Sequence, residues 1–374
     1  WPNLLTLNVP LFAGGARDIL FNADELAVLA GGSITTAGNV FFRNVTDNRA
    51  MRIGDTSTAA NTFNVTKQIL DSVTRTGANV AANVVVGRDS AESINSGVAT
   101  VLNYAFSQGL IVKASEIRVP GGAGALSSTS KLQFETYEST GAGAGNGSIL
   151  FSATLSPIIA PTLLATAFRD ISVDATLRSN AINGLIQLKA GQGASSTGGA
   201  NNSGNLTVSA TGLVQTLQTG ANIVLFSGLQ DGDLLLNGSV RSAQNVSVQA
   251  LGGSITVNSP ARIEGLTLEA LAKESSLLRT SVETILRGKV IGSGLMTGQN
   301  LVIFETDDVL DQFREGFDGE VCVGADVYEE LFVVVLQQVE AGVGEVVHVE
   351  EFAHGGAGAP YLHVRCAFLL GRME

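Results

Sequence analysis

Apolar and polar residues alternate over short stretches along most of this chain. The clearest stretch is 245–259, NVSVQALGGSITVNS, in which Val and Ile alternate with Ser, Thr and Gln on both sides of a Gly pair. A period of two places the apolar side chains on one buried face of a β-strand. We expect two strands joined by a turn at Gly252 and Gly253, where glycine permits positive φ. The same GGSIT pentapeptide occurs near the start of the chain, with Gly31 and Gly32.

A second pattern recurs through the chain. A small residue or Gln is followed by Asn and then by three mostly apolar residues, and the asparagines in this pattern are Asn39, Asn83, Asn205, Asn222, Asn245 and Asn300. Internal repetition of this kind indicates a solenoid. Asn222 and Asn245 are 23 residues apart, which fits a unit near 22 residues, although other intervals are longer or shorter.

These patterns predict an all-β fold, a parallel β-helix with irregular coils of about 22 residues. Inward Val, Ile and Leu would stack into one core, and the asparagines at strand starts would form a ladder at a corner. We divide the chain into an entry segment or cap at 1–17, a β-helical body at 18–304 and an acidic C-terminal segment at 305–374.

Two stretches fit a strand less clearly. Leucines in 266–287 are spaced near helical periodicity, whereas Thr and Val in the same stretch favour a strand, and we favour the strand. The stretch 91–109 has the same ambiguity. A body rich in Gly (44 in the chain) and poor in aromatic and charged residues supports short strands with tight turns.

Composition changes abruptly near residue 305. Residues 305–374 contain no Ser, Asn or Lys, one Thr, both cysteines (Cys322 and Cys366) and all three histidines (His348, His354 and His363). One interpretation is a separate domain or cap with strands at 331–336, 345–349 and 361–369. The other is a sequence that leaves its proper reading frame after about Thr306.

Charge follows the same division. Residues 1–304 hold 19 acidic and 19 basic residues, whereas 305–374 hold 15 acidic and 3 basic, so the segment carries the whole net charge of −12. Because the body has no net charge, it gives no reason to expect nucleic-acid binding, which requires a basic stripe. The apolar runs are of strand length, too short for a membrane-spanning helix.

Residues that could carry chemistry are sparse in the body, which contains no histidine. Asp231 and Asp233 form a D-x-D motif, but Asp-Gly is a common turn signal and calcium needs six to eight oxygen ligands. Asp18, Asp24, Asp170 and Asp174 are expected on a solvated outer face. Although His363 and Cys366 have the chemistry of metal ligands, no second paired motif accompanies them. We therefore predict no catalytic residue, no cofactor and no metal.

The strand–Gly-Gly–strand units and the Asn-Val-x-Val phrases resemble the repeats of filamentous-haemagglutinin-type exoproteins and related giant bacterial surface proteins. The resemblance covers about residues 18–304. It implies a right-handed parallel β-helix, secretion, and a role in adhesion or in building a surface fibre. No functional residue of that family carries over to this chain.

The leading hypothesis is a non-enzymatic extracellular structural protein, a β-solenoid subunit of a surface filament or adhesin fibre that self-associates through strand edges. One alternative is a β-helical polysaccharide lyase or hydrolase with its site beside the loops at 121–147 or 191–204. Another is a carbohydrate-binding adhesin module that contacts surface glycans.

Overall fold

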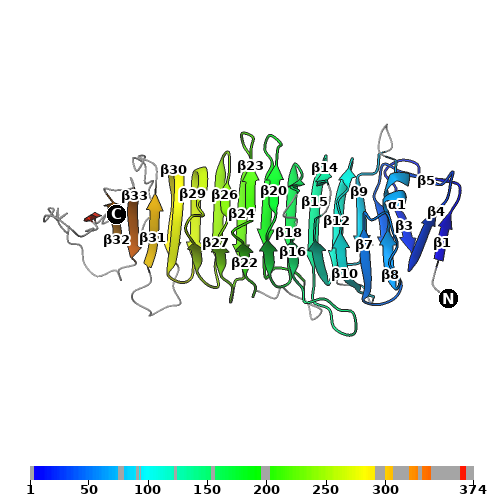
Figure 1. The fold of residues 1–374 in the computed structure, drawn as a ribbon, viewed down its shortest axis with the longest axis horizontal. Helices are drawn as coiled ribbons and strands as arrows, with labels where there is room; N and C mark the ends of the chain where they lie inside the picture. The colour runs from blue at the N-terminus through cyan, green and yellow to red at the C-terminus, as the bar shows by residue number, and fades with distance from the viewer. Residues whose placement is uncertain are drawn as a thin grey trace.

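The chain forms a long rod of stacked coils, with the N-terminus at one end and the C-terminal strands at the other (Figure 1). This computed structural model describes residues 4–74, 80–89, 92, 94–121, 124–152, 156–194, 203–290 and 300–305, and the backbones of three later strands. Strands pair in parallel with strands of the neighbouring coils throughout the body. The predicted all-β parallel β-helix is therefore confirmed.

One stack of strands, which we call the first stack, holds eleven strands that pair in chain order. Its members are β3 (Ile19–Asn22), β6 (Val40–Arg43), β9 (Asn83–Gly87), β12 (Gly109–Ala114), β15 (Lys131–Thr136), β18 (Thr162–Thr166), β21 (Leu185–Lys189), β24 (Asn222–Ser227), β27 (Asn245–Ala250) and the ends of β29 (Ile263–Ala272) and β30 (Ser276–Val290). At about 4.8 Å between neighbouring strands, eleven strands span about 50 Å.

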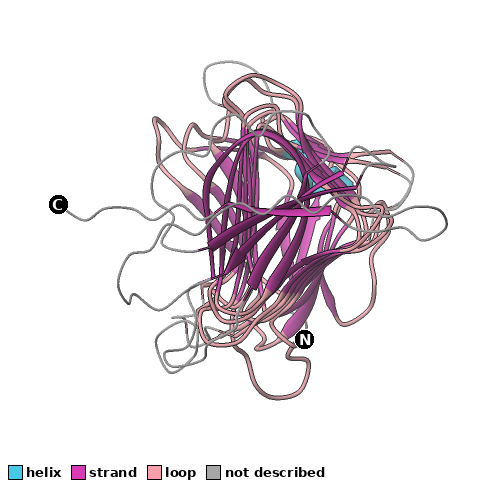
Figure 2. Ribbon diagram, turned by 90° about the vertical axis from the view of Figure 1, so that its left-hand side faces the viewer, coloured by secondary structure: helices cyan, strands magenta, loops and turns pink. Residues whose placement is uncertain are grey.

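Two further stacks lie beside the first (Figure 2 views the rod from its end), and the third begins only at β11. The second stack contains β8 (Thr62–Val65), β7 (Arg49–Ile53), β10 (Ser96–Val101), β13 (Glu116–Val119), β16 (Ile149–Phe151), β19 (Ile171–Val173), β22 (Leu206–Val208), β25 (Leu234–Leu236), β28 (Ile255–Val257), the start of β30, and β31 (Asn300–Glu305). The third stack contains β11 (Ala105–Phe106), β14 (Leu126–Ser128), β17 (Ile158–Ile159), β20 (Thr176–Ser179), β23 (Leu213–Thr216), β26 (Ser239–Arg241), and parts of β29 and β30.

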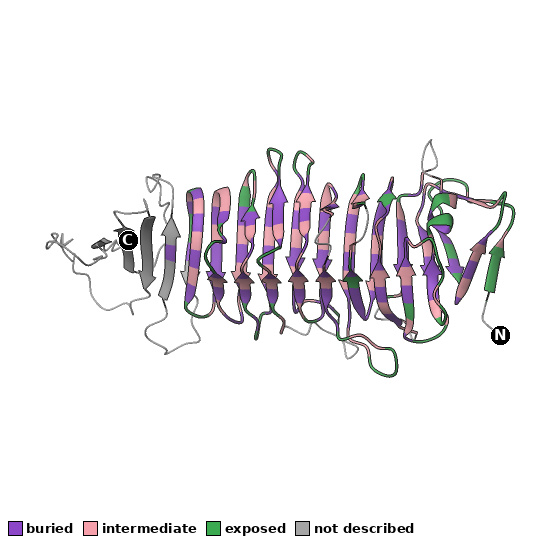
Figure 3. Ribbon diagram, in the orientation of Figure 1, coloured by how far each residue is buried: buried purple, intermediate pink, exposed green. Residues whose placement is uncertain are grey.

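The core follows from the alternation of residues. In the described part of the body, inward side chains are buried, and the apolar ones form one continuous cluster from Ile19 to Ile303 (Figure 3). The Val and Ile residues of 245–259 that the alternation places inward are all buried. The stretch 266–287 lies in β29 and β30, so the preference for strand over helix is confirmed.

The N-terminal coils depart from a simple stack. β1 (Leu4–Leu7) pairs in parallel with β4 (Glu25–Val28), and β2 (Pro10–Phe12) pairs with β5 (Ser33–Thr35). The ladder therefore already includes part of the segment expected as an entry or cap. The short helix α1 (Lys67–Ser72) replaces a strand, with Thr66 as its N-cap and Ile69 and Leu70 buried.

Strand order is inverted in one place. β7 pairs with β10 on one side and with β8 on its other side, although β8 follows β7 in the chain. β8 in turn lies against β4 of an earlier coil. This insertion explains why 44 residues separate Val40 from its first-stack partner Val84, whereas 22 separate Val246 from Leu268.

The parallel pattern ends with β31. β33 (Leu331–Gln337) pairs with β31 in antiparallel fashion, and β32 (Glu320–Asp326) pairs antiparallel with β33 and with β34 (His363–Ala367). The change of pairing coincides with the change of composition near residue 305. The strand expected at 345–349 lies outside the described residues.

Candidate functional site

Four of the six predicted ladder asparagines lie in one corner row, directly before the inward residues of the first stack. Asn83 Nδ2 donates a hydrogen bond to Asn39 Oδ1 at 2.8 Å, and Asn39 donates through its backbone N–H to Asp18 Oδ1 at 2.7 Å. Asp18 therefore occupies the same row one coil earlier. Side-chain amides repeated at the coil spacing satisfy one another in this way.

The row resumes in the later coils. Asn245 Nδ2 donates to Asn222 Oδ1 at 2.8 Å, and Thr267 Oγ1 donates to Asn245 Oδ1. Asn222 also donates to the carbonyl of Gly220 at 3.0 Å. Apart from the Asn222–Gly220 bond within a coil, each of these bonds joins one coil to the next, so the row stabilises stacking.

Asn205 lies at a different corner, before the second stack. Asp170 Oδ1 accepts from the Asn205 backbone N–H, and Asn205 Oδ1 accepts from the Asp233 N–H, both at 2.8 Å. Asp233 Oδ1 then accepts from the N–H and hydroxyl of Ser254, both at 2.8 Å. Asp170 and Asp233 are thus bonded into a second corner row. Asn300 begins β31, and its neighbour Leu301 pairs with Ser276.

A third row consists of hydroxyls at the ends of third-stack strands, and the sequence did not indicate it. Ser128 donates to the carbonyl of Gln108 at 2.8 Å, Ser179 to that of Pro161 at 2.9 Å, and Ser242 to that of Ala221 at 3.0 Å. Each acceptor directly precedes a first-stack strand. The available signal was a Ser or Thr at an inward position of the alternation.

The two GGSIT pentapeptides do not play the same part. The one with Gly252 and Gly253 turns from β27 of the first stack into β28 of the second, whereas the one with Gly31 and Gly32 turns from β4 into β5, which pairs with β2. Gly31 alone has positive φ, at 95°. Gly252 and Gly253 are needed because there is no room for a side chain. An added Cβ would lie 2.5 Å from Asp231 N at Gly252 and 2.6 Å from Asp233 Oδ1 at Gly253.

Charged side chains gather on the outer face of the first stack near its N-terminal end. Arg88 Nη1 lies 2.5 Å from Glu92 Oε2, and Arg43 Nη1 lies 3.3 Å from Glu92 Oε1. Arg88 also donates through Nε to the carbonyl of Asn44 at 2.6 Å. The Arg43 guanidinium stacks over the Phe41 ring, 5.1 Å from its centroid. The two arginines thus share one carboxylate.

The same face continues into a second group. Lys113 Nζ contacts Asp89 and lies 3.5 Å from Glu135 Oε2. Burial lowers the pKa of Lys113, but the hydrogen bond and charge of Asp89 and the charge of Glu135 outweigh it, and the pKa is raised. A lysine with a raised pKa stays protonated and is a poor general base. With Arg43, Arg88 and Glu92 this group forms the ionic cluster, three cations and three carboxylates.

Asp24 is buried, which corrects its expected place on a solvated face. Its Oδ1 accepts from the N–H groups of Val45 and Thr46 at 3.1 and 2.9 Å, and its Oδ2 accepts from the Thr46 hydroxyl at 2.5 Å. Burial raises the pKa of Asp24, yet these hydrogen bonds and Arg49 together lower it below 3.8. The carboxylate is therefore a buried cap for the next coil.

The lowered pKa predicts how stability depends on pH. A carboxyl group whose pKa is lower in the folded state contributes stability above its unfolded value, 3.8, and this contribution disappears as pH falls through the folded pKa. We expect wild type to lose more stability than D24N between about pH 5 and pH 2. Urea unfolding at several pH values measures this, with D231N at an exposed turn as control. Parallel curves for wild type and D24N would contradict it.

In the described part of the chain, no cluster of three or more His, Cys, Asp or Glu side chains could hold a metal ion. His363 and Cys366 lie on β34, and Cys322 lies opposite Cys366 in the backbone register of β32 and β34. His348 and His354 fall outside the described residues. Within the same limits, the single helix is too short and too polar to cross a bilayer.

Comparison with known proteins identifies no relative: no family model, no curated protein and no solved structure matches this chain.

Proposed function

We propose that this chain is a non-enzymatic, extracellular structural protein, a β-solenoid that contributes to a surface filament or adhesin fibre. The supporting observation is the single apolar core that continues through all the coils of the body. The corner rows of Asn, Asp and Ser add hydrogen bonds between coils. In a solenoid each coil contacts its neighbours, so a rod of this kind gives length and stiffness.

Self-association would use the exposed edge at the N-terminal end of the rod. β1 pairs with β4 on one side, and no strand of the described residues covers its other side. Leu4 and Phe12 are 57% and 62% exposed there. An open strand edge with apolar side chains is a template for pairing with another chain. We infer that a second copy of the rod pairs at this edge.

We expect the double variant L4K/F12K to abolish concentration-dependent assembly, because charge at an edge strand opposes strand pairing. Sedimentation velocity over a range of concentrations, with negative-stain electron microscopy, measures the assemblies. The matched control is I182K, since Ile182 is 72% exposed on a loop at the side of the rod. Monomeric wild-type rods at high concentration, or assembly that survives in L4K/F12K, would contradict the role of this edge.

One observation favours the second candidate, a polysaccharide lyase or hydrolase. The ionic cluster brings Arg43, Arg88 and Lys113 together with three carboxylates on one face, and enzymes of this class need such convergence. The raised pKa of Lys113 and the pairing of every member argue for a structural cluster instead.

We therefore expect no turnover of polygalacturonate or alginate. Absorbance of unsaturated products detects a lyase, and release of reducing ends detects a hydrolase. Turnover that K113A eliminates without loss of folding would establish the enzyme and refute the structural role of the cluster.

A further inference from the structure

Arginines gather on the outer face of the third stack toward its C-terminal end. Arg178 of β20 pairs in register with Gln215 of β23, which pairs with Arg241 of β26, and Arg241 pairs with Glu264 of β29. The row ends on Ser281 of β30. The residue directly before each of these five positions is buried in the core, so the five side chains point outward, although Gln215 itself is only 7% exposed.

Two more arginines lie beside this row. Arg262 and Arg279 directly precede Ile263 and Thr280, which are register partners, so the two arginines lie on adjacent coils two residues from the row. Together with the row they form what we call the arginine strip: Arg178, Gln215, Arg241, Arg262, Glu264, Arg279 and Ser281. In the earlier half of the third stack the corresponding outward residues, Ala105, Ser127 and Ile159, are uncharged.

Contacts within the strip hold some of the guanidinium groups in place. With the Gln215 amide turned so that its oxygen faces Arg178, this oxygen accepts from Nη2 and Nε of Arg178, both at 2.7 Å. Arg241 Nε lies 3.2 Å from Glu264 Oε1, and the Arg241 side chain is 51% exposed. The strip carries four positive charges and one negative charge, that of Glu264, and Glu283 lies just beyond it. An excess of positive charge is thus concentrated on one side of a body whose net charge is zero.

We propose that the arginine strip binds a linear acidic polysaccharide through the carboxylates of its uronic acid residues. Guanidinium groups form bidentate hydrogen bonds with carboxylates. Ser281 and Glu264 supply partners for sugar hydroxyls. Arg178 and Arg241 lie two coils apart, about 10 Å, and Arg262 and Arg279 lie on adjacent coils, about 4.8 Å apart, so a repeating polymer laid along the rod could meet them in turn.

The composition of the strip favours a glycan over a nucleic acid. Nucleic-acid surfaces on strands use aromatic side chains for base stacking, and none of the seven strip residues is aromatic. Glu264 within the strip would also repel a phosphate backbone. The inference goes beyond self-association, since the strip lies along the side of the rod and the open strand edge lies at its end.

Binding of polygalacturonate oligomers by isothermal titration calorimetry tests the proposal. We expect binding that weakens as salt rises, no binding of the fully methyl-esterified polymer, and at least a tenfold loss of affinity in R241Q/R262Q. The matched control is R118Q, which removes one exposed arginine from the second stack and should bind like wild type. R241K/R262K keeps the charge without the forked geometry, and we expect an intermediate loss.

Any of the following results would contradict the proposal. Failure of wild type to bind polygalacturonate, or equal loss in R118Q, would show that the strip is not a glycan site. Equal affinity for duplex DNA, lost in the same variants, would show an unselective anion surface. If R241Q/R262Q does not fold, R241K/R262K with wild-type affinity would refute the role of the guanidinium forks. Because monomeric L4K/F12K retains the strip, it should bind as wild type does, which separates this proposal from self-association.

Discussion

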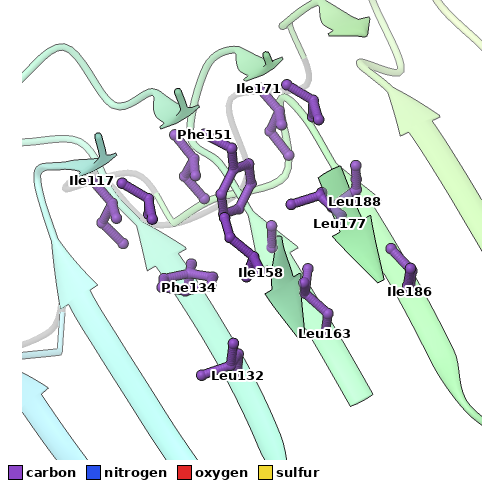
Figure 4. Close-up of a cluster of buried hydrophobic side chains, with 14 of the residues drawn as sticks. Ile117, Leu132, Phe134, Phe151, Ile158, Leu163, Ile171, Leu177, Ile186 and Leu188 are labelled. Atoms are coloured by element: carbon purple, nitrogen blue, oxygen red, sulfur yellow. The ribbon is translucent and has the colours of Figure 1, made fainter. Parts of the chain in front are cut away.

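Truncation of Phe134 to alanine is expected to lower the free energy of unfolding by about 3–5 kcal/mol. Phe134 is fully buried in β15, and its ring lies edge-on to that of Phe151 with centroids 5.4 Å apart (Figure 4). Its register partners in the coils on either side are Val112 and Ala165. Ala165 is too small to fill the space that the Phe134 ring leaves. A cavity should therefore remain in F134A.

Urea unfolding followed by circular dichroism measures the effect of F134A. The control is Q133A, which changes the adjacent, outward-facing residue of the same strand and should alter stability by about 0.5 kcal/mol or less. A loss below about 1 kcal/mol in F134A would show that the coils collapse around the missing ring and that the core is less closely packed than the structure indicates.

Replacement of Gly87 by alanine is the second change with a large expected effect. Gly87 has φ of 99°, and an added Cβ would overlap the Lys113 carbonyl oxygen in the next coil. Positive φ costs a residue with a side chain about 1–2 kcal/mol. The forced shift of β12 should add about 1–3 kcal/mol. The pairing of β9 with β12, and with it the position of Lys113 in the ionic cluster, should be disturbed.

G124A separates these two causes. Gly124 has a similar φ of 94°, but an added Cβ there meets nothing within 4 Å. The decrease in the free energy of unfolding of G124A should therefore reflect backbone strain alone. The decrease for G87A should be clearly larger in the same unfolding measurement. Equal losses would show that the close approach of β9 to β12 is relaxed without effect.

Local alternation was sufficient to predict the strands and the parallel β-helix. Inward Val and Ile residues at a period of two, as in β27 and β28, allow little but a strand with one buried face. The stretch in β30 was ambiguous because its leucines also match a helix, and pairing with β29 and β28 decided it. α1 was missed since Ile69 and Leu70 are adjacent, although Thr66 offered an N-cap signal.

Contacts between coils could not be predicted in the same way. Asn39 and Asn83 are 44 residues apart and bond directly, because a coil of unusual length separates them. The sequence alone does not reveal that length. Likewise, nothing around Asp24 shows that Val45 and Thr46 will donate to it. Identical GGSIT letters at two different corners show that a local repeat does not define a position in the coil.

The inverted order of β7 and β8 has a consequence for how the chain acquires its structure during synthesis. A ribosome delivers residues in sequence, and coils that stack in chain order can each settle on a finished neighbour. β7 cannot do so, because the strand beneath it, β8, is synthesised later. The chain must therefore be synthesised at least to Val65, the end of β8, before β7 can pair with β8. Only then can β10 and the regular coils be added one after another.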